Sequence, residues 1–358
     1  MRWPGARGHA ILQPSRAPLE RCGADPTQHV QAVPTGATQA TTGLVRKVMV
    51  SALIAGLVFT ALALYGDVRE LRRTVRAFSG TAFGIALALA ATNYALRVVR
   101  WQFYLRRLGI VLPWGESSVV FLSGFVLSVT PGKVGEVFKS LLLYETRGTS
   151  IARTAPIVVA ERLTDLIALV LLVSIGAAAF AHGTAVAISS SLLVAFVFAV
   201  CTYKPLGHAL LTFAEKLPML ARVSHRLREA YDALLETTRP APMLLGTAVA
   251  FVAWGLECGS LYAIVRGFDG VALPWDATVF AYSASTIAGA VAMMPGGLGV
   301  TEVGMTALLQ ALGGAPMRPA IATASTILVR IATLWFAVGI GGVALAVHRA
   351  LYANKRGS

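Results

Sequence analysis

The chain alternates between long apolar stretches and short polar ones. Six of the apolar stretches are near or above the roughly 20 residues that an α-helix needs to cross the hydrocarbon core of a bilayer. They cover residues 48–65, 81–99, 155–181, 184–202, 242–265 and 320–347. The pattern therefore predicts six membrane-spanning helices.

Two further apolar segments are each interrupted by proline and glycine. Residues 117–144 are broken at Pro131-Gly132-Lys133, and residues 277–312 are broken at Pro295-Gly296-Gly297. Proline removes a helix hydrogen-bond donor, and glycine loosens the backbone further. Each segment is therefore either a re-entrant hairpin, which enters and leaves the membrane on one side, or a kinked full span.

The distribution of Lys and Arg favours the hairpins. With two hairpins and a cytoplasmic N-terminus, 21 of the 31 Lys and Arg residues fall inside, six outside and four within the membrane. With two full spans, the counts become 14 inside and 13 outside. Cytoplasmic loops carry an excess of basic residues, so we expect two hairpins and both termini in the cytoplasm. The basic loop 203–240 then lies at the cytoplasmic surface, where it can form an amphipathic helix.

The two broken segments resemble each other and predict an internal repeat. Both contain Pro-Gly, then Gly, then Glu, then a short apolar helix. Three spans separate them, and three is odd, so the hairpins enter from opposite faces, as in inverted-repeat transporters. We place repeat 1 at about 81–181 and repeat 2 at about 241–347. The alternative is a chance likeness between two Pro-Gly kinks.

Composition supports an all-α polytopic membrane protein. Residues of the AVILMFWYC set make up 56% of the chain before glycine is counted, and only 13% are charged. A soluble domain has about 45–50% apolar residues with glycine included and about 25% charged ones, so a soluble protein is excluded. The net charge of +14 follows from basic cytoplasmic loops rather than from nucleic-acid binding. We expect one transmembrane domain over 44–352, after a disordered cytoplasmic tail over 1–43.

Charged residues inside the apolar segments are the candidate functional residues, because each is costly in the bilayer interior. Three cations are expected to contact a phosphate, helped by the backbone of the two Pro-Gly breaks. This substrate-binding set is Lys133, Lys139, Arg162, Pro131, Gly132, Pro295, Gly296 and Gly297. The gating or coupling set is Glu136, Glu161, Asp165, Glu302 and Arg330. The alternative is internal ion pairing that neutralises the bundle, with the pairs Lys133–Glu136, Arg162–Asp165 and Glu302–Arg330.

Motifs for bond-breaking chemistry do not occur in the sequence. Around Lys133 the chain reads TPGKVGE, which lacks the spacing of a phosphate-binding P-loop, and neither GxSxG nor HExxH is found. Cys22, Cys201 and Cys258 form neither a disulfide framework nor a metal pattern. We expect a transporter rather than an enzyme, with no catalytic residue, no cofactor and no metal. Movement of its substrate would be downhill or coupled to an ion.

Three motifs occur in order along the chain: PGKVGE, then an ER pair followed by Asp165, then PGGLGVTE. In this combination the chain resembles the flippase-like family, also called the lysylphosphatidylglycerol synthase transmembrane-region family. The resemblance covers about residues 45–350. It implies a module that moves lipids between leaflets. Aminoacyl transfer is not expected, because no synthase domain follows before Ser358.

The sequence as a whole predicts a lipid transporter of the bacterial inner membrane. Its substrate would be a phospholipid, an aminoacylated lipid, or a polyprenyl-linked or hopanoid lipid. Lipid-synthesis enzymes of the cell envelope are the partners to expect, and nucleic acid is not. Two alternatives stay open: an integral-membrane lipid-modifying transferase, and a non-transporting partner of cell-envelope enzymes.

Overall fold

A computed structural model describes residues 67–130, 137–177, 239–292 and 294–353, with the short pieces 57–58, 188–189 and 192. The chain divides into two units, Met1–Gly43 and Leu44–Ser358, and the described residues all belong to the second. They are helical, with no strand among them. The predicted tail and the bulk of the expected segments 48–65, 184–202 and 203–240 lie outside the described residues.

Three helices of the described part are long and apolar enough to span a bilayer. They are α3 (Gly80–Arg107), α11 (Pro240–Arg266) and a composite helix over Pro319–Leu351. The composite helix consists of α14 (Pro319–Arg330), a π-helical turn η4 (Ile331–Trp335) and α15 (Phe336–Ala353). These helices match three of the six predicted spans.

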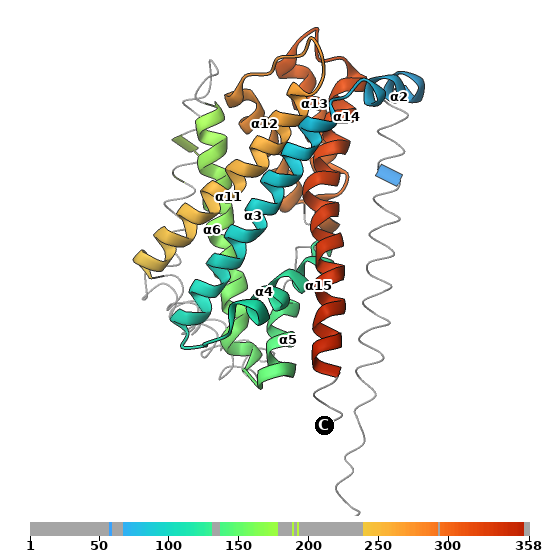
Figure 1. Cartoon of the computed structure of the whole chain (residues 1–358). Helices are drawn as coiled ribbons and strands as arrows, with labels where there is room; N and C mark the ends of the chain where they lie inside the picture. Colours follow the sequence, from blue (N-terminus) through green and yellow to red (C-terminus); the bar gives the residue numbers. More distant parts are fainter. Residues whose placement is uncertain are drawn as a thin grey trace, which may run out of the picture. The chain divides into compact units, whose positions relative to one another are not determined.

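A fourth long helix, α6 (Ile151–Ala177), has the length of a span but carries more charge. Glu161, Arg162 and Asp165 lie in its middle, in a helix that is otherwise largely apolar. Figure 1 shows α6 running beside α11 and α3. A polar cluster on such a helix has to face the interior of the bundle, where partners can neutralise it.

The first broken segment begins and ends at the same end of the bundle. It comprises α4 (Trp114–Ser123), η1 (Gly124–Leu127) and α5 (Phe138–Arg147), with residues 131–136 outside the described part. Arg147 at the end of α5 forms an ion pair with Glu116 at the start of α4. The guanidinium of Arg153, near the start of α6, donates to the Leu108 carbonyl just after α3 at 2.5 Å. This segment is therefore anchored beside the C-terminal end of α3.

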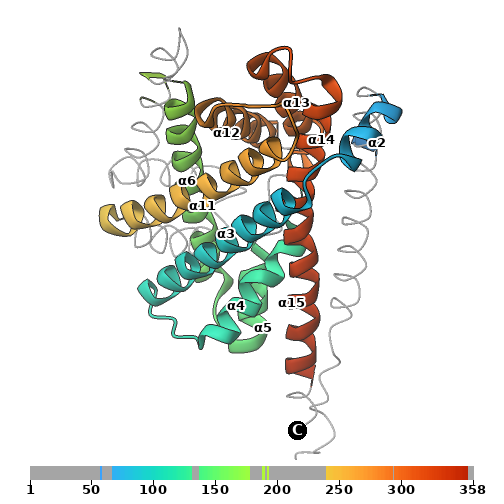
Figure 2. The same cartoon turned by 45° about the horizontal axis from the view of Figure 1, so that its top comes forward.

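The second broken segment begins and ends at the opposite end of α3. It comprises α12 (Trp275–Val291), η3 (Pro295–Gly297) and α13 (Val300–Gly313), and α12 packs along α13. The Ser79 amide, before α3, donates to the Gly267 carbonyl, after α11, at 3.0 Å. Arg318, after α13, forms a 2.9 Å ion pair with Glu70 of the short helix α2 (Val68–Arg76). Figures 1 and 2 show α12, α13 and α2 towards one end of the bundle, and α4 and α5 towards the other end, beside α15.

Two glycines let the broken segments pack closely on the long helices. A Cβ atom added at Gly341 of α15 would lie 2.5 Å from the Val126 amide nitrogen in η1. A Cβ atom at Gly176 of α6 would lie 2.7 Å from the Phe280 amide nitrogen in α12. Small residues allow backbones to approach in this way and are typical of helix interfaces in membranes.

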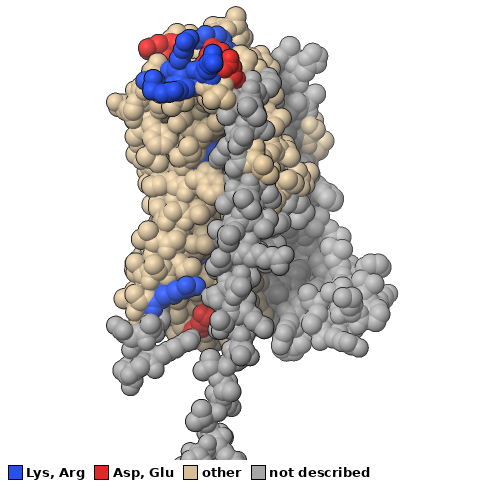
Figure 3. All heavy atoms as spheres, turned by 90° about the vertical axis from the view of Figure 1, so that its right-hand side faces the viewer, with Lys and Arg blue, Asp and Glu red and all other residues tan. Residues whose placement is uncertain are grey.

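The surface of the bundle fits a bilayer. Figure 3 shows the charged side chains of one face gathered at its two ends, with an almost entirely apolar band between them. At one end the charged group belongs to α2 and its neighbour Arg318. An apolar band between polar ends is the arrangement that burial in hydrocarbon requires.

Candidate functional site

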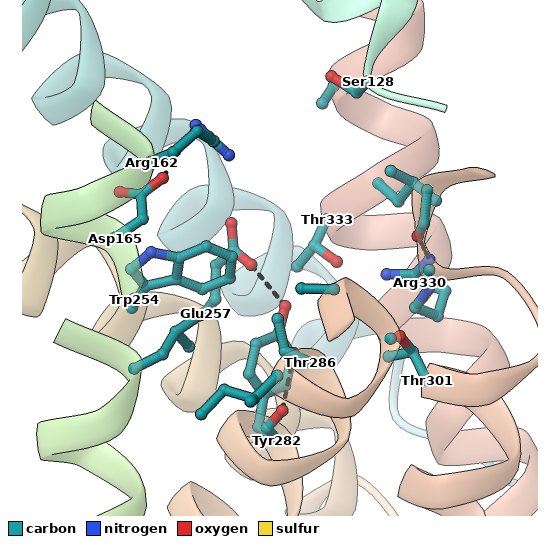
Figure 4. A pocket seen from close by; sticks show the side chains of 18 of the residues that line it. Ser128, Arg162, Asp165, Trp254, Glu257, Tyr282, Thr286, Thr301, Arg330 and Thr333 are labelled. Atoms are coloured by element: carbon teal, nitrogen blue, oxygen red, sulfur yellow. Dashed lines mark hydrogen bonds and ion pairs between the residues drawn. The ribbon is translucent and has the colours of Figure 1, made fainter. Parts of the chain in front are cut away.

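A partly open cavity of about 380 Å³ lies among α3, α6, α11, α12, α14 and the π-helical turn. Most of its lining is apolar, but five charged residues face it from four of the helices (Figure 4). They are Arg97, Arg162, Asp165, Glu257 and Arg330. A site of this kind, apolar with a few convergent polar groups, is typical of small-molecule binding.

Asp165 on α6 is surrounded by three arginines. Its Oδ1 lies 2.8 Å from Nη1 of Arg100, and its Oδ2 lies 3.2 Å from Nη1 of Arg97 and 2.9 Å from Nη2 of Arg162. Arg97 and Arg100 are three residues apart on α3, so both reach α6 from one helix face. One carboxylate thus holds three guanidinium groups together at the edge of the cavity.

A chain of hydrogen bonds continues from this cluster to Glu257 on α11. Arg97 Nε donates to Asn93 Oδ1 at 2.8 Å, and the Asn93 amide nitrogen donates to Glu257 Oε1. The Tyr282 hydroxyl of α12 donates to Glu257 Oε2 at 2.5 Å. Within the described residues Glu257 is satisfied by these hydrogen bonds rather than by an ion pair, which distinguishes it from the other buried acids.

Arg330 connects the long helix to the second Pro-Gly break. Its Nε lies 2.6 Å from Glu302 Oε1, and its Nη2 donates to the Gly296 carbonyl at 2.6 Å. The other oxygen of Glu302 accepts the Gly299 amide at 2.7 Å. Gly296, Gly297 and Gly299 all have positive φ, which explains why glycine is needed in this turn. One guanidinium and one carboxylate therefore fix the shape of the break.

The π-helical turn forms one wall of the cavity. Thr333 in this turn contributes its carbonyl, which accepts a hydrogen bond from the Tyr94 hydroxyl of α3. Such a turn contains one residue more than an α-helical turn and is common at functional sites. On the opposite wall, the Arg97 guanidinium lies 4.8 Å from the ring centre of Trp254.

The structure brings some of the predicted site residues together and separates others. Arg162, Asp165, Arg330, Gly296 and Gly297 line the cavity. Glu302 and Pro295 lie directly behind that lining, in or beside the turn that Arg330 holds. The predicted ion pairs Arg162–Asp165 and Glu302–Arg330 are both present.

Lys139 is buried away from the cavity. Its ammonium lies 2.7 Å from Glu161 Oε2 and faces the rings of Trp101 and Phe121, at 4.8 and 4.4 Å from their centres. Glu161 and Asp165 share a face of α6, and each has its own cationic partners, so their mutual repulsion is offset. Pro131, Gly132, Lys133 and Glu136 lie outside the described residues.

Sequence reasoning missed Arg97, Glu257 and three aromatic residues of the lining. Arg97 and Glu257 could have been predicted by the same rule as the other site residues, because each is a charged residue within an apolar stretch. The 21 basic residues counted as cytoplasmic above include Arg97 and Arg100, at the end of the predicted span 81–99. The structure corrects this, because both are buried in α3. Nothing in the sequence distinguishes the missed aromatics Tyr94, Trp254 and Tyr282 from packing residues.

The apolar surface and the long apolar helices define an integral membrane protein, and the charged side chains of the cavity lie between those helices. The chain belongs to the family of the lysylphosphatidylglycerol synthase TM region, whose match covers residues 48–341. It is similar to a UPF0104 membrane protein of Pyrococcus horikoshii, with 23% identity over 76% of this chain and 88% of the relative. It is also similar to a UPF0104 membrane protein of Methanothermobacter thermautotrophicus, with 24% identity over 84% of this chain and 92% of the relative.

Proposed function

We propose that this protein moves a lipid between the two leaflets of its membrane. The lipid's anionic or phosphate-linked headgroup would pass through the polar cavity, while its acyl or prenyl tails stay in the bilayer. The observation that carries the proposal is a cavity with charged side chains whose lining includes residues of three helices long and apolar enough to span a membrane. Membership of a family named for a lipid synthase's membrane region supports a role with lipids.

We infer that the two broken segments are re-entrant hairpins of an inverted repeat. The ends of the first segment lie beside the C-terminal end of α3, and the ends of the second lie beside its N-terminal end. In transporters with inverted repeats, the substrate binds where discontinuous helices meet near the middle of the membrane. Gly296 and Gly297 of the second break line the cavity, as this arrangement requires.

We further propose that the protein acts as a transporter rather than an enzyme, in a bacterial inner membrane. No P-loop occurs in the sequence, so movement is downhill or coupled to an ion. Which lipid is carried then depends on the supply from lipid-synthesis enzymes in the same membrane.

Purified protein in vesicles containing a fluorescent phosphatidylglycerol tests the proposal. Chemical quenching from outside reports how fast labelled lipid moves from the inner to the outer leaflet. We expect faster movement than in protein-free vesicles, and slowing of about tenfold or more in Arg162→Ala, because a charge-assisted hydrogen bond is lost. Arg318→Ala is the control, since that arginine forms an exposed ion pair at the end of the bundle. Equal rates with and without wild-type protein would reject the function.

A further inference from the structure

The short helix α2 gathers basic side chains at one end of the bundle. Four of its nine residues are arginines with exposed side chains, and we call them the arginine face: Arg69, Arg72, Arg73 and Arg76. They are four of the six basic residues that the hairpin topology places outside the cytoplasm. The positive-inside rule predicts few basic residues on that side, so their clustering on one helix calls for another explanation.

The spacing of residues in α2 makes it an amphipathic helix. The arginines follow the pattern i, i+3, i+4, i+7, which puts them on one side of the helix. Three apolar residues follow i, i+3, i+7 on a different side: Val68, Leu71 and Val75. Leu71 is half-buried and packs against the core, and α2 as a whole contacts α14. Helices with an apolar face and a basic face typically lie in the interface between hydrocarbon and water.

The acidic residues of this segment do not occupy the arginine face. Asp67 caps the helix, because its Oδ1 accepts the Arg69 backbone amide at 2.9 Å. Glu70 pairs with Arg318, which comes from outside the helix, at 2.9 Å. Among the described residues, no ion pair or hydrogen bond involves the guanidinium groups of the arginine face. Four cationic groups are therefore available to an anion from outside the chain.

The position of α2 indicates which anion that is. Figure 3 shows the basic group at the end of the bundle, directly beyond the apolar band. The phosphates of a bilayer lie at this boundary, just outside the hydrocarbon core. Guanidinium groups suit such a partner because their planar N–H forks match phosphate oxygens.

We propose that the arginine face of α2 binds the headgroups of anionic phospholipids in the leaflet at that end of the bundle. The apolar side of the helix rests on the core, and the arginines reach the phosphates around it. This inference is independent of the proposed function, because a headgroup bound at the surface does not have to enter the cavity.

Nitroxide-labelled lipids test the proposal in vesicles that hold the full chain. The three cysteines are replaced by alanine, and Ala77→Cys, exposed and next to α2, carries a fluorophore. Phosphatidylcholine vesicles receive the same small fraction of nitroxide-labelled phosphatidylglycerol or nitroxide-labelled phosphatidylcholine. We expect the anionic lipid to quench at least about twofold more strongly, because each arginine near the surface attracts it. Raising the salt concentration to about 0.5 M should weaken this preference.

Substitution of the arginine face gives the matched variants. Replacing all four arginines by glutamine should make the two lipids quench equally, whereas replacing them by lysine should keep most of the preference. All four side chains are exposed, so both variants should fold. A fluorophore at Val343→Cys, exposed on α15, is the control position and should show no preference.

Three results would overturn the proposal. Equal quenching by the two lipids at position 77 of the arginine-containing chain would show that the helix does not select anionic lipid. A preference that survives the glutamine substitutions would place its source elsewhere. A preference of the same size at position 343 would mean that anionic lipid surrounds the whole bundle rather than the arginine face.

Discussion

Lys139 and Glu161 illustrate how this protein tolerates ions in an apolar interior. Both side chains are almost completely buried, and the ammonium also faces two aromatic rings. Removing one partner of a buried ion pair leaves an uncompensated charge, whereas removing both is often nearly neutral. The ion pair joins α5 to α6, and we expect the role of Lys139 to be structural.

Substitution of this pair distinguishes structure from substrate binding. We expect Lys139→Met to destabilise the protein by about 3–5 kcal/mol, because Glu161 is left alone in the interior. The double variant Lys139→Met/Glu161→Gln should recover most of that loss. Thermal unfolding in detergent measures both effects. A stable Lys139→Met protein that no longer binds phosphatidylglycerol would instead support the phosphate contact that the sequence predicts.

At the scale of the elements, the broken segments are held by close backbone contacts at glycine. Gly341 of α15 lies against η1, where a methyl group would come within 2.5 Å of a backbone nitrogen. Its neighbour Gly342 has no atom within 4 Å of the position that a Cβ would occupy. The two positions thus share a helix and a residue type but differ in their surroundings.

This contrast gives a matched pair of variants. Gly341→Ala should lower stability by about 1–3 kcal/mol, because the added methyl forces α15 away from the first broken segment. Gly342→Ala should leave stability unchanged or raise it by up to about 1 kcal/mol, since alanine favours helix more than glycine does. Thermal unfolding of both variants in detergent measures the two changes in stability. Equal effects would mean that the contact between α15 and η1 is loose.

For the whole molecule, the decisive feature is that the two broken segments are anchored at opposite ends of α3. Arg147 follows the first segment and Arg318 follows the second, and both form exposed ion pairs. Pairs of this kind contribute little to stability, so either arginine can be replaced. We therefore expect Arg147 and Arg318 to lie at opposite faces of the membrane.

Cysteine labelling tests this arrangement in vesicles of known orientation. In a chain whose three cysteines are replaced by alanine, Arg147→Cys and Arg318→Cys should react with an impermeant maleimide from opposite sides. The basic residues predict that position 147 is cytoplasmic. Labelling of both positions from one side would contradict the inverted repeat.

The sequence predicted what depends on local pattern. Three long helices, two broken segments and the ion pair Arg162–Asp165 follow from hydropathy, from Pro and Gly, and from spacing within a helix. It failed where partners come from distant segments. Glu161 is 22 residues from Lys139, and Glu257 is 164 residues from Asn93, so tertiary packing alone decides these contacts.

The π-helical turn after Arg330 divides one long helix into two parts that contact different segments. Before the turn, α14 contacts α13 of the second broken segment, and after it, α15 contacts α4 and η1 of the first. Each residue advances an α-helix by about 100°, so the extra residue in the turn sets the angular phase between these two halves. Deleting one residue there would rotate the Gly341 face away from η1 while Arg330 stayed in place. One continuous helix therefore fixes the angle between the surface that contacts the second broken segment and the surface that contacts the first.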